Sequence, residues 1–161
     1  MSNKKFPRIY SLSTVGIRNH YNSDYRFHPF RTDFAGDSGV GKSIIADVLQ
    51  LILVGEREFK SATDSSSERE ARKLIIERYG YVFLNIAIDT DKFIVIGMYI
   101  STTSIDPFII QANIGLDVFE PLSSPLISKD FMSGDEIIDI TNLPERMKEN
   151  NKTKIKIQIA I

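Results

Sequence analysis

The chain has 161 residues, of which 42% are hydrophobic and 25% charged, so one compact domain with a single hydrophobic core is expected. A formal net charge of -1 excludes a global positive field for nucleic acid, and the lack of cysteine excludes disulfides and thiolate metal sites. Residues 1–7 lack the apolar core of a signal peptide and no apolar run reaches the ~20 residues of a membrane span, which predicts a cytoplasmic protein without membrane contact.

The chain opens with a predicted β-hairpin. Residues 8–15 and 26–34 are extended stretches, and the turn chemistry between them is concentrated at residues 16–19. After a glycine-containing loop, residues 43–54 (SIIADVLQLILV) have helical length, no glycine or proline, and apolar side chains on most sides. This pattern indicates a buried helix that ends at Gly55.

A serine-rich stretch follows, which predicts an exposed loop over residues 59–67. Ser67 and Glu70 have the spacing of a capping box, so a second helix is predicted from there through Arg78. Gly80 would then end it.

The rest of the chain is predicted to be rich in strands. Residues 81–88 and 92–101 are rich in Ile, Val, Phe and Tyr and are separated by an Asp-Thr-Asp turn, which indicates a second hairpin. Residues 107–114 continue as a third strand, and residues 143–149 form a short helix. Residues 154–161 alternate Lys, Gln or Ala with Ile like a strand.

Residues 36–43 contain the one motif in the chain that indicates a chemical function, the binding of phosphate groups. The chain matches G-x-x-x-x-G-K-[ST] at every fixed position, through Gly36, Asp37, Ser38, Gly39, Val40, Gly41, Lys42 and Ser43. In such a loop the glycines allow backbone N–H groups to surround phosphate oxygens. Lys42 would reach the β- and γ-phosphates, Ser43 would bind Mg²⁺, and the following helix would add the positive end of its dipole. The motif therefore predicts a site for a nucleotide and magnesium.

The loop string is similar to that of Rab-type small GTPases, which makes a GTPase switch the first alternative. That family also needs Asn-Lys-x-Asp to read guanine and Asp-x-x-Gly as a switch. Residues 151–154 read Asn-Lys-Thr-Lys, and residues 130–134 place one residue too many between Asp and Gly. The approach strand is also polar at residues 31–33. ATP is therefore the expected nucleotide.

A second resemblance covers more of the chain. The helix with Asp47 after Gly-Lys-Ser, and the strand, turn and strand that lead into Phe34-Ala35-Gly36, resemble SMC, RecF and related ABC-type ATPases. The likeness is good over residues 8–55 and weaker to residue 114. One departure is Ser38, where the family usually has Asn, which leaves the γ-phosphate contact from that position open.

The resemblance implies an α/β fold: a P-loop NTPase lobe with a mixed sheet plus an antiparallel β-layer. Residues 1–161 would form a single lobe, divided into residues 1–58, 59–80 and 81–161. The family keeps its Walker B carboxylates, its Ser-Gly-Gly signature and its switch histidine in a C-terminal lobe, and this chain has none of them. The implied protein binds MgATP as an N-terminal lobe and hydrolyses it only with a C-terminal lobe or a second head. The implied role is DNA maintenance, repair or defence, with DNA as a candidate partner. A further alternative is a non-catalytic module with a vestigial loop.

No catalytic residue is assigned, but three polar residues have a possible role beside the nucleotide. Asp89 ends an apolar run and could act as a Walker B ligand, yet Asn85 interrupts that run, so a hairpin turn is the favoured interpretation. Gln111 could be the family's lid glutamine; a solvent-facing strand position is favoured. Asp47 fits either a position behind the magnesium ligands or a polar helix stripe.

The remaining candidates are aromatic and basic. His20 and His28 lack metal-ligand spacing. A set of aromatic residues mixed with arginines could stack a base, although packing and a solvated face explain them as well: Tyr21, Tyr25, Phe27, Arg18, Arg26 and Arg31.

Overall fold

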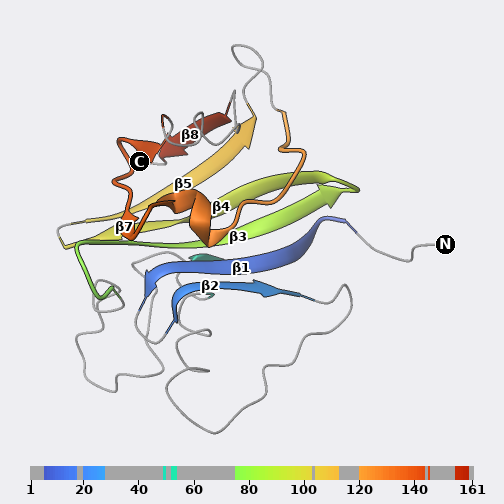
Figure 1. Ribbon diagram of the computed structural model, residues 1–161. Helices are drawn as coiled ribbons and strands as arrows, with labels where there is room; N and C mark the ends of the chain where they lie inside the picture. The colour runs from blue at the N-terminus through green and yellow to red at the C-terminus, as the bar shows by residue number, and fades with distance from the viewer. Residues whose placement is uncertain are drawn as a thin grey trace, which may run out of the picture.

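The computed structural model describes residues 6–17, 20–27, 49, 52–53, 75–102, 104–112, 120–143, 145 and 155–159. Its main element is a six-stranded sheet in the order β2-β1-β3-β4-β5-β8 (Figure 1). The strands are β1 Arg8–Ile17, β2 His20–Arg26, β3 Tyr79–Asp89, β4 Lys92–Ser101, β5 Ile105–Ala112 and β8 Ile155–Ile159. A 3-10 helix, η2 Ser128–Phe131, precedes a small pair formed by β6 Met132–Ser133 and β7 Glu136–Ile137.

Short links between neighbouring strands set the topology of the first half of the sheet. Two residues separate β1 from β2, and a Thr90-Asp91 turn separates β3 from β4, with Asp91 at a φ of 54°. Asparagine and aspartate tolerate this left-handed conformation, which two-residue hairpins require. Such links can join only antiparallel neighbours. β1 then pairs with β3 on its other side, so the two hairpins become one sheet.

The predicted α/β fold, a P-loop NTPase lobe with a mixed sheet, is wrong. Every neighbouring pair in the main sheet is antiparallel. Within the described ranges, α-helical residues are limited to Leu49, Ile52, Leu53, Leu143 and Glu145. Parallel strands need crossovers of a dozen or more residues, whereas β1–β2 and β3–β4 are tight hairpins. The α/β expectation came from the motif and its family, while the strand-forming composition and the Asp-Thr-Asp turn of residues 81–101 indicated a hairpin.

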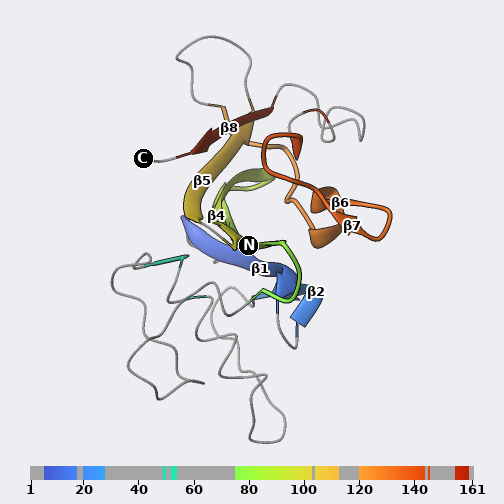
Figure 2. The same cartoon turned by 90° about the vertical axis from the view of Figure 1, so that its left-hand side faces the viewer.

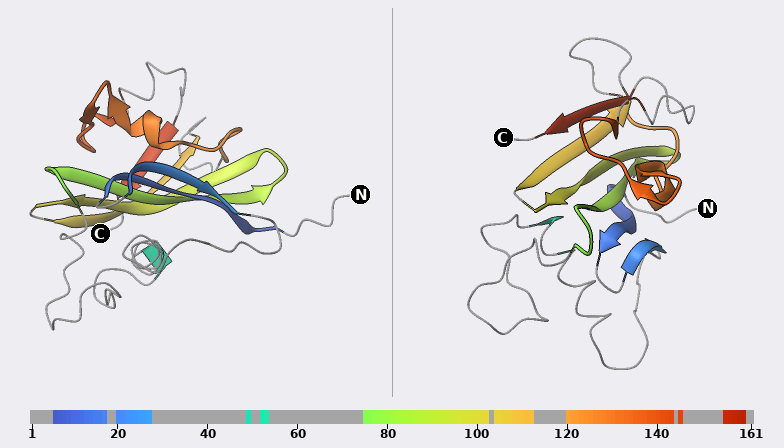
Figure 3. Two further views of the ribbon diagram at one scale, coloured as in Figure 1. Left: turned by 60° about the horizontal axis from the view of Figure 1, so that its bottom comes forward. Right: turned by 60° about the vertical axis from the view of Figure 1, so that its left-hand side comes forward.

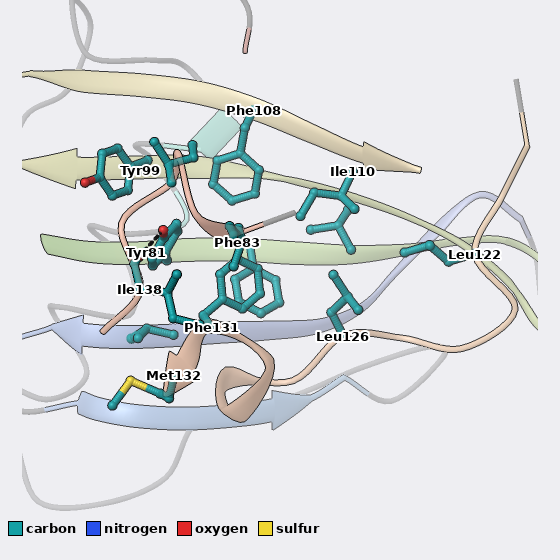
Figure 4. Packing of buried hydrophobic residues seen from close by; sticks show 14 of the residues in the cluster. Tyr81, Phe83, Tyr99, Phe108, Ile110, Leu122, Leu126, Phe131, Met132 and Ile138 are labelled. Atoms are coloured by element: carbon teal, nitrogen blue, oxygen red, sulfur yellow. Dashed lines mark hydrogen bonds between the residues drawn. The ribbon is translucent and has the colours of Figure 1, made fainter. Parts of the chain in front are cut away.

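The sheet buries both of its faces. One face is covered by residues 120–143, which we call the covering segment. Its Phe131 joins Tyr81 and Phe83 of β3 in a buried cluster. The sheet curls around this segment (Figure 2). The ring centroids of Phe83 and Phe131 lie 4.5 Å apart and those of Tyr81 and Phe131 lie 4.7 Å apart (Figure 4). Interlocked aromatic rings of this kind make β3 the centre of the core.

The opposite face carries a second cluster of buried residues: Leu12, Ile17, Val82, Leu84, Met98 and Ile100. Leu49 and Ile52, from the helix predicted over residues 43–54, pack against it. Figure 3 shows this helical fragment and the covering segment on opposite sides of the sheet. Because both faces are covered, the strands read as nearly continuous apolar runs rather than clean alternations.

The predicted strands of the second half are confirmed, with shifted ends. The hairpin predicted over residues 81–101 is β3–β4, and the third strand is β5, two residues earlier than predicted. The last strand is β8, within the predicted residues 154–161.

Two predictions in the first half need correction. The second strand of the first hairpin was predicted over residues 26–34, but β2 spans His20–Arg26 and shares only Arg26 with that range; residues 28–34 lie outside the described part. The helix predicted through Arg78 is wrong over residues 75–78, because Ile75 makes a β-bridge with Ile17 and strand β3 already begins at Tyr79. Ile75 packs against the second cluster, and residues 67–74 of the predicted helix lie outside the described part.

In the part of the chain that the structure describes, none of the helical residues belongs to a helix with the length and apolarity to span a bilayer.

Candidate functional site

The structure describes residues before and after the glycine loop, up to Phe27 and again at Leu49. The loop itself, Gly36 to Ser43, and Asp47 lie outside the described residues. Before it, the backbone N–H of Phe27 donates to the carbonyl oxygen of Tyr10 at 2.9 Å, which ties the end of β2 to β1. After it, Leu49 and Ile52 are helical and pack on the second face of the sheet. The nearest described residues before the motif therefore follow an edge strand, and the nearest after it are helical.

Asp89 is the last residue of β3 and directly precedes the Thr90-Asp91 turn, in agreement with the favoured interpretation. Its Oδ1 accepts a hydrogen bond from the backbone N–H of Thr90 at 2.7 Å, and its side chain is exposed. Asn85, which interrupts the apolar run before it, is fully buried and bound to the covering segment. This stretch is thus the central strand of an antiparallel sheet, with a turn carboxylate at its end.

The other polar candidates are dispersed. Gln111 is half-buried on β5, opposite Lys156 of β8, and His20 begins the edge strand β2. His28, Arg18 and Arg31 lie outside the described residues. In the described ranges, no group of three or more His, Asp or Glu side chains could hold a metal ion.

The aromatic residues of β2 are used for packing. Tyr21 packs against the first cluster, and Tyr25 and Phe27 pack against the second, so the three do not form one stacking surface. Burial raises the pKa of the Tyr21 hydroxyl, and Glu77 adds to the shift through its charge and a hydrogen bond. The guanidinium of Arg26 lies over the ring of Tyr10, 4.5 Å from its centroid. The structure therefore favours the packing interpretation.

One cavity missed from the sequence lies at the end of the sheet where β1 begins and β2 ends. We call this cavity of about 180 Å³ the end pocket; its lining includes Arg8, Tyr10, Arg26, Asp89 and Asp91. Arg8 also lies over Tyr10, at 5.5 Å, and Phe93 meets the same ring edge-on at 5.0 Å. The Nε and Nη1 atoms of Arg8 are buried without a hydrogen-bond partner. The sequence signal for the end pocket is a pair of arginines: Arg8 begins β1 and Arg26 ends β2, its antiparallel partner.

A second cavity, of about 400 Å³, lies beside the covering segment and includes Tyr79, Glu136, Asp139, Asn142 and Glu145 in its lining. The ring of Tyr79 stacks on Tyr99, with centroids 5.8 Å apart. Burial raises the pKa of the Tyr99 hydroxyl well above its usual value, and the charge of Asp139 adds to the shift. The Tyr99 hydroxyl therefore keeps its proton further into the alkaline range than an exposed tyrosine does.

Comparisons with protein-family models, with curated proteins and with solved structures find no match for the chain.

Proposed function

We propose that this protein binds MgATP through the loop from Gly36 to Ser43. The observation that carries the proposal is the full match of this segment to the phosphate-binding motif, followed by residues that are helical at Leu49, Ile52 and Leu53. A phosphate loop needs such a helix, because its first N–H groups and its dipole face the anion. Leu49 and Ile52 pack on the sheet, and this packing supports the proposal because it would hold the helix in one position.

Each part of the loop has a separate task in the proposal. Backbone N–H groups between Gly36 and Gly41 surround the phosphate oxygens, and Lys42 neutralises charge on the β- and γ-phosphates. The hydroxyl of Ser43 completes the shell of the magnesium ion, which otherwise keeps water and phosphate oxygens as ligands. Adenine is preferred over guanine because residues 151–154 lack the aspartate that would bind guanine.

Binding without appreciable hydrolysis is expected of the chain alone. In-line attack by water needs a group that positions the water and a second carboxylate for the metal. Asp89, the nearest candidate, serves the β3–β4 turn instead. Following the SMC/RecF resemblance, the proposal assigns those groups to a C-terminal lobe or a second head. The same resemblance implies work in DNA maintenance, repair or defence.

The test is competition for a fluorescent ATP analogue in the presence of Mg²⁺. ATP should displace the analogue better than GTP, and Lys42→Ala should weaken binding about tenfold or more, since a hydrogen bond to a charged group contributes about 1.5–3 kcal/mol. Lys129→Ala, at an exposed lysine of η2, is the matched control and should bind like the wild type. Unchanged affinity in Lys42→Ala would overturn the proposal in favour of a vestigial loop. A preference for GTP would favour the GTPase alternative.

A further inference from the structure

We propose that the end pocket is a binding site for a small oxyanion, a phosphate or carboxylate group, held by Arg8 and Arg26. The site is separate from the glycine loop and does not rest on nucleotide binding. Its residues come from the start of β1, the end of β2 and the β3–β4 turn, which the sheet brings to one end (Figure 1).

The guanidinium of Arg8 is the first reason. Its Nε and Nη1 atoms are shielded from solvent and have no hydrogen-bond partner, although Asp89 and Asp91 line the same pocket. A buried cationic donor without a partner is costly, and such groups in native proteins call for an explanation. Nη2 is not among these unpartnered buried atoms. A negative group in the pocket would therefore compensate a charge that water solvates poorly.

The ring of Tyr10 is the second reason, because it holds two cations together. The guanidinium carbons of Arg26 and Arg8 lie 4.5 Å and 5.5 Å from its centroid, and Phe93 fixes the ring from the edge. A planar guanidinium that contacts an aromatic ring still presents N–H groups at its rim for oxyanions. Because both arginines line the end pocket, an anion inside it would interact with two positive charges.

The size and the acidic side of the pocket limit what it accepts. Its volume of about 180 Å³ lies below the roughly 300–1,000 Å³ of sites for drug-sized ligands. A phosphate or acetate ion is thus a better match than a whole nucleotide. Asp89 is engaged by the N–H of Thr90, while Asp91 is exposed at the left-handed turn position. Asp91 therefore competes with an incoming anion for the two arginines.

The site can be tested by following arginine Nε–H signals by NMR. Inorganic phosphate and, separately, acetate are titrated into the full chain carrying Lys42→Ala, at constant ionic strength set with chloride. The Nε–H signal of Arg8, assigned by its loss in Arg8→Gln, should shift and saturate. Arg26→Gln should weaken binding about tenfold. Asp91→Asn should tighten it about two- to fivefold, the size expected from an exposed charge. Lys129→Gln, at an exposed lysine on η2, should change nothing.

Other outcomes would overturn the proposal. An Arg8 signal that does not move with either anion leaves no site in the pocket. Weaker binding in Asp91→Asn would mean that Asp91 does not oppose the anion. If Arg8→Gln does not fold, Arg26→Gln and Asp91→Asn still decide, because neither residue is buried. A phosphate effect seen in the wild type and absent in Lys42→Ala would assign the anion to the glycine loop alone. Saturation by phosphate but not by acetate would identify phosphate as the source.

Discussion

Asn85 on β3 binds the backbone of Leu126 twice, 41 residues further along the chain. Its Nδ2 donates to the carbonyl oxygen of Leu126 at 2.8 Å, and its Oδ1 accepts from the Leu126 N–H at 2.9 Å. The same Nδ2 donates to Ser11 Oγ on β1 at 2.8 Å. The Asn85 side chain thus satisfies both backbone groups of Leu126, as a neighbouring strand would. This explains why a polar residue lies at the centre of the core.

Replacing Asn85 with Leu should destabilise the fold by about 3 kcal/mol. The change leaves the N–H and carbonyl of Leu126 buried without partners, and each such group costs about 1–3 kcal/mol. Denaturant unfolding measures the loss. The same change at Asn22, an exposed residue of β2, is the control. Equal stability of the two variants would contradict this role for Asn85.

A second anchor joins the covering segment to the edge hairpin through Asp24. Its Oδ1 accepts hydrogen bonds from Ser13 Oγ at 2.5 Å and from the Ser128 N–H at 2.9 Å, and its Oδ2 accepts from Ser128 Oγ at 2.9 Å. Asp24→Ala should cost about 2 kcal/mol, since hydrogen bonds to charged groups contribute about 1.5–3 kcal/mol. The Ser128 amide should also exchange with solvent faster. Asp135→Ala, in the exposed β6–β7 turn, should leave that exchange rate unchanged; unaltered exchange in Asp24→Ala would argue against the anchor.

Gly97 on β4 makes room for the aromatic core. A Cβ at this position would lie 2.4 Å from the carbonyl oxygen of Val82, 2.6 Å from the Cβ of Phe83 and 2.9 Å from Phe108 Cζ. Two of these contacts belong to atoms that cannot swing away, so Gly97→Ala should cost about 3 kcal/mol, at the upper end of overpacking effects. Thermal unfolding provides the measurement.

Gly134 is the comparison for that substitution. It has a φ of 63° and open space around it, so Gly134→Ala should cost only the ~1 kcal/mol of a left-handed residue. A larger loss of stability at Gly134 than at Gly97 would show that crowding at the sheet does not govern the cost of adding a methyl group.

Tyr81 makes stability depend on pH in the alkaline range. Burial, followed by the neighbouring Tyr99 and Asp139, raises the pKa of its hydroxyl far above the usual value of 10.0, and the hydroxyl donates to the carbonyl of Ile138 (Figure 4). The folded state therefore keeps a proton that the unfolded chain releases above about pH 10. This contribution is fully present below pH 10 and is lost as pH rises, by about 1.4 kcal/mol per pH unit.

Denaturant unfolding at several alkaline pH values, with tyrosinate absorbance as the second signal, checks this slope. Tyr81→Phe should be less stable at neutral pH, because the carbonyl of Ile138 loses its donor, but its stability should fall less steeply with pH. A slope identical to that of the wild type would exclude Tyr81 as the main source of the alkaline dependence.

Local pattern predicted the β3–β4 hairpin, and it failed where a distant partner decides the structure. The β3–β4 hairpin could be predicted because β-branched and aromatic runs flank an Asp-Thr-Asp turn. Asn85 appeared only as an interruption, since its partners Ser11 and Leu126 lie 74 and 41 residues away. The second strand of the first hairpin was predicted to begin at Arg26, where β2 ends, for a related reason: the extent of β2 follows its register with β1, from Ile17 opposite His20 to Ser11 opposite Arg26.

The match to the phosphate-binding motif and the β3–β4 turn are properties that the sequence determines by itself, because residue types and spacing over a few positions are enough to specify them. Only the tertiary structure decided that β1 lies between β2 and β3, that residues 120–143 and the helix at Leu49 cover opposite faces, and that Arg8 and Arg26 share the ring of Tyr10. These relations follow from burying two apolar faces at once. That requirement selects partners across the whole chain, and no short window of sequence contains it.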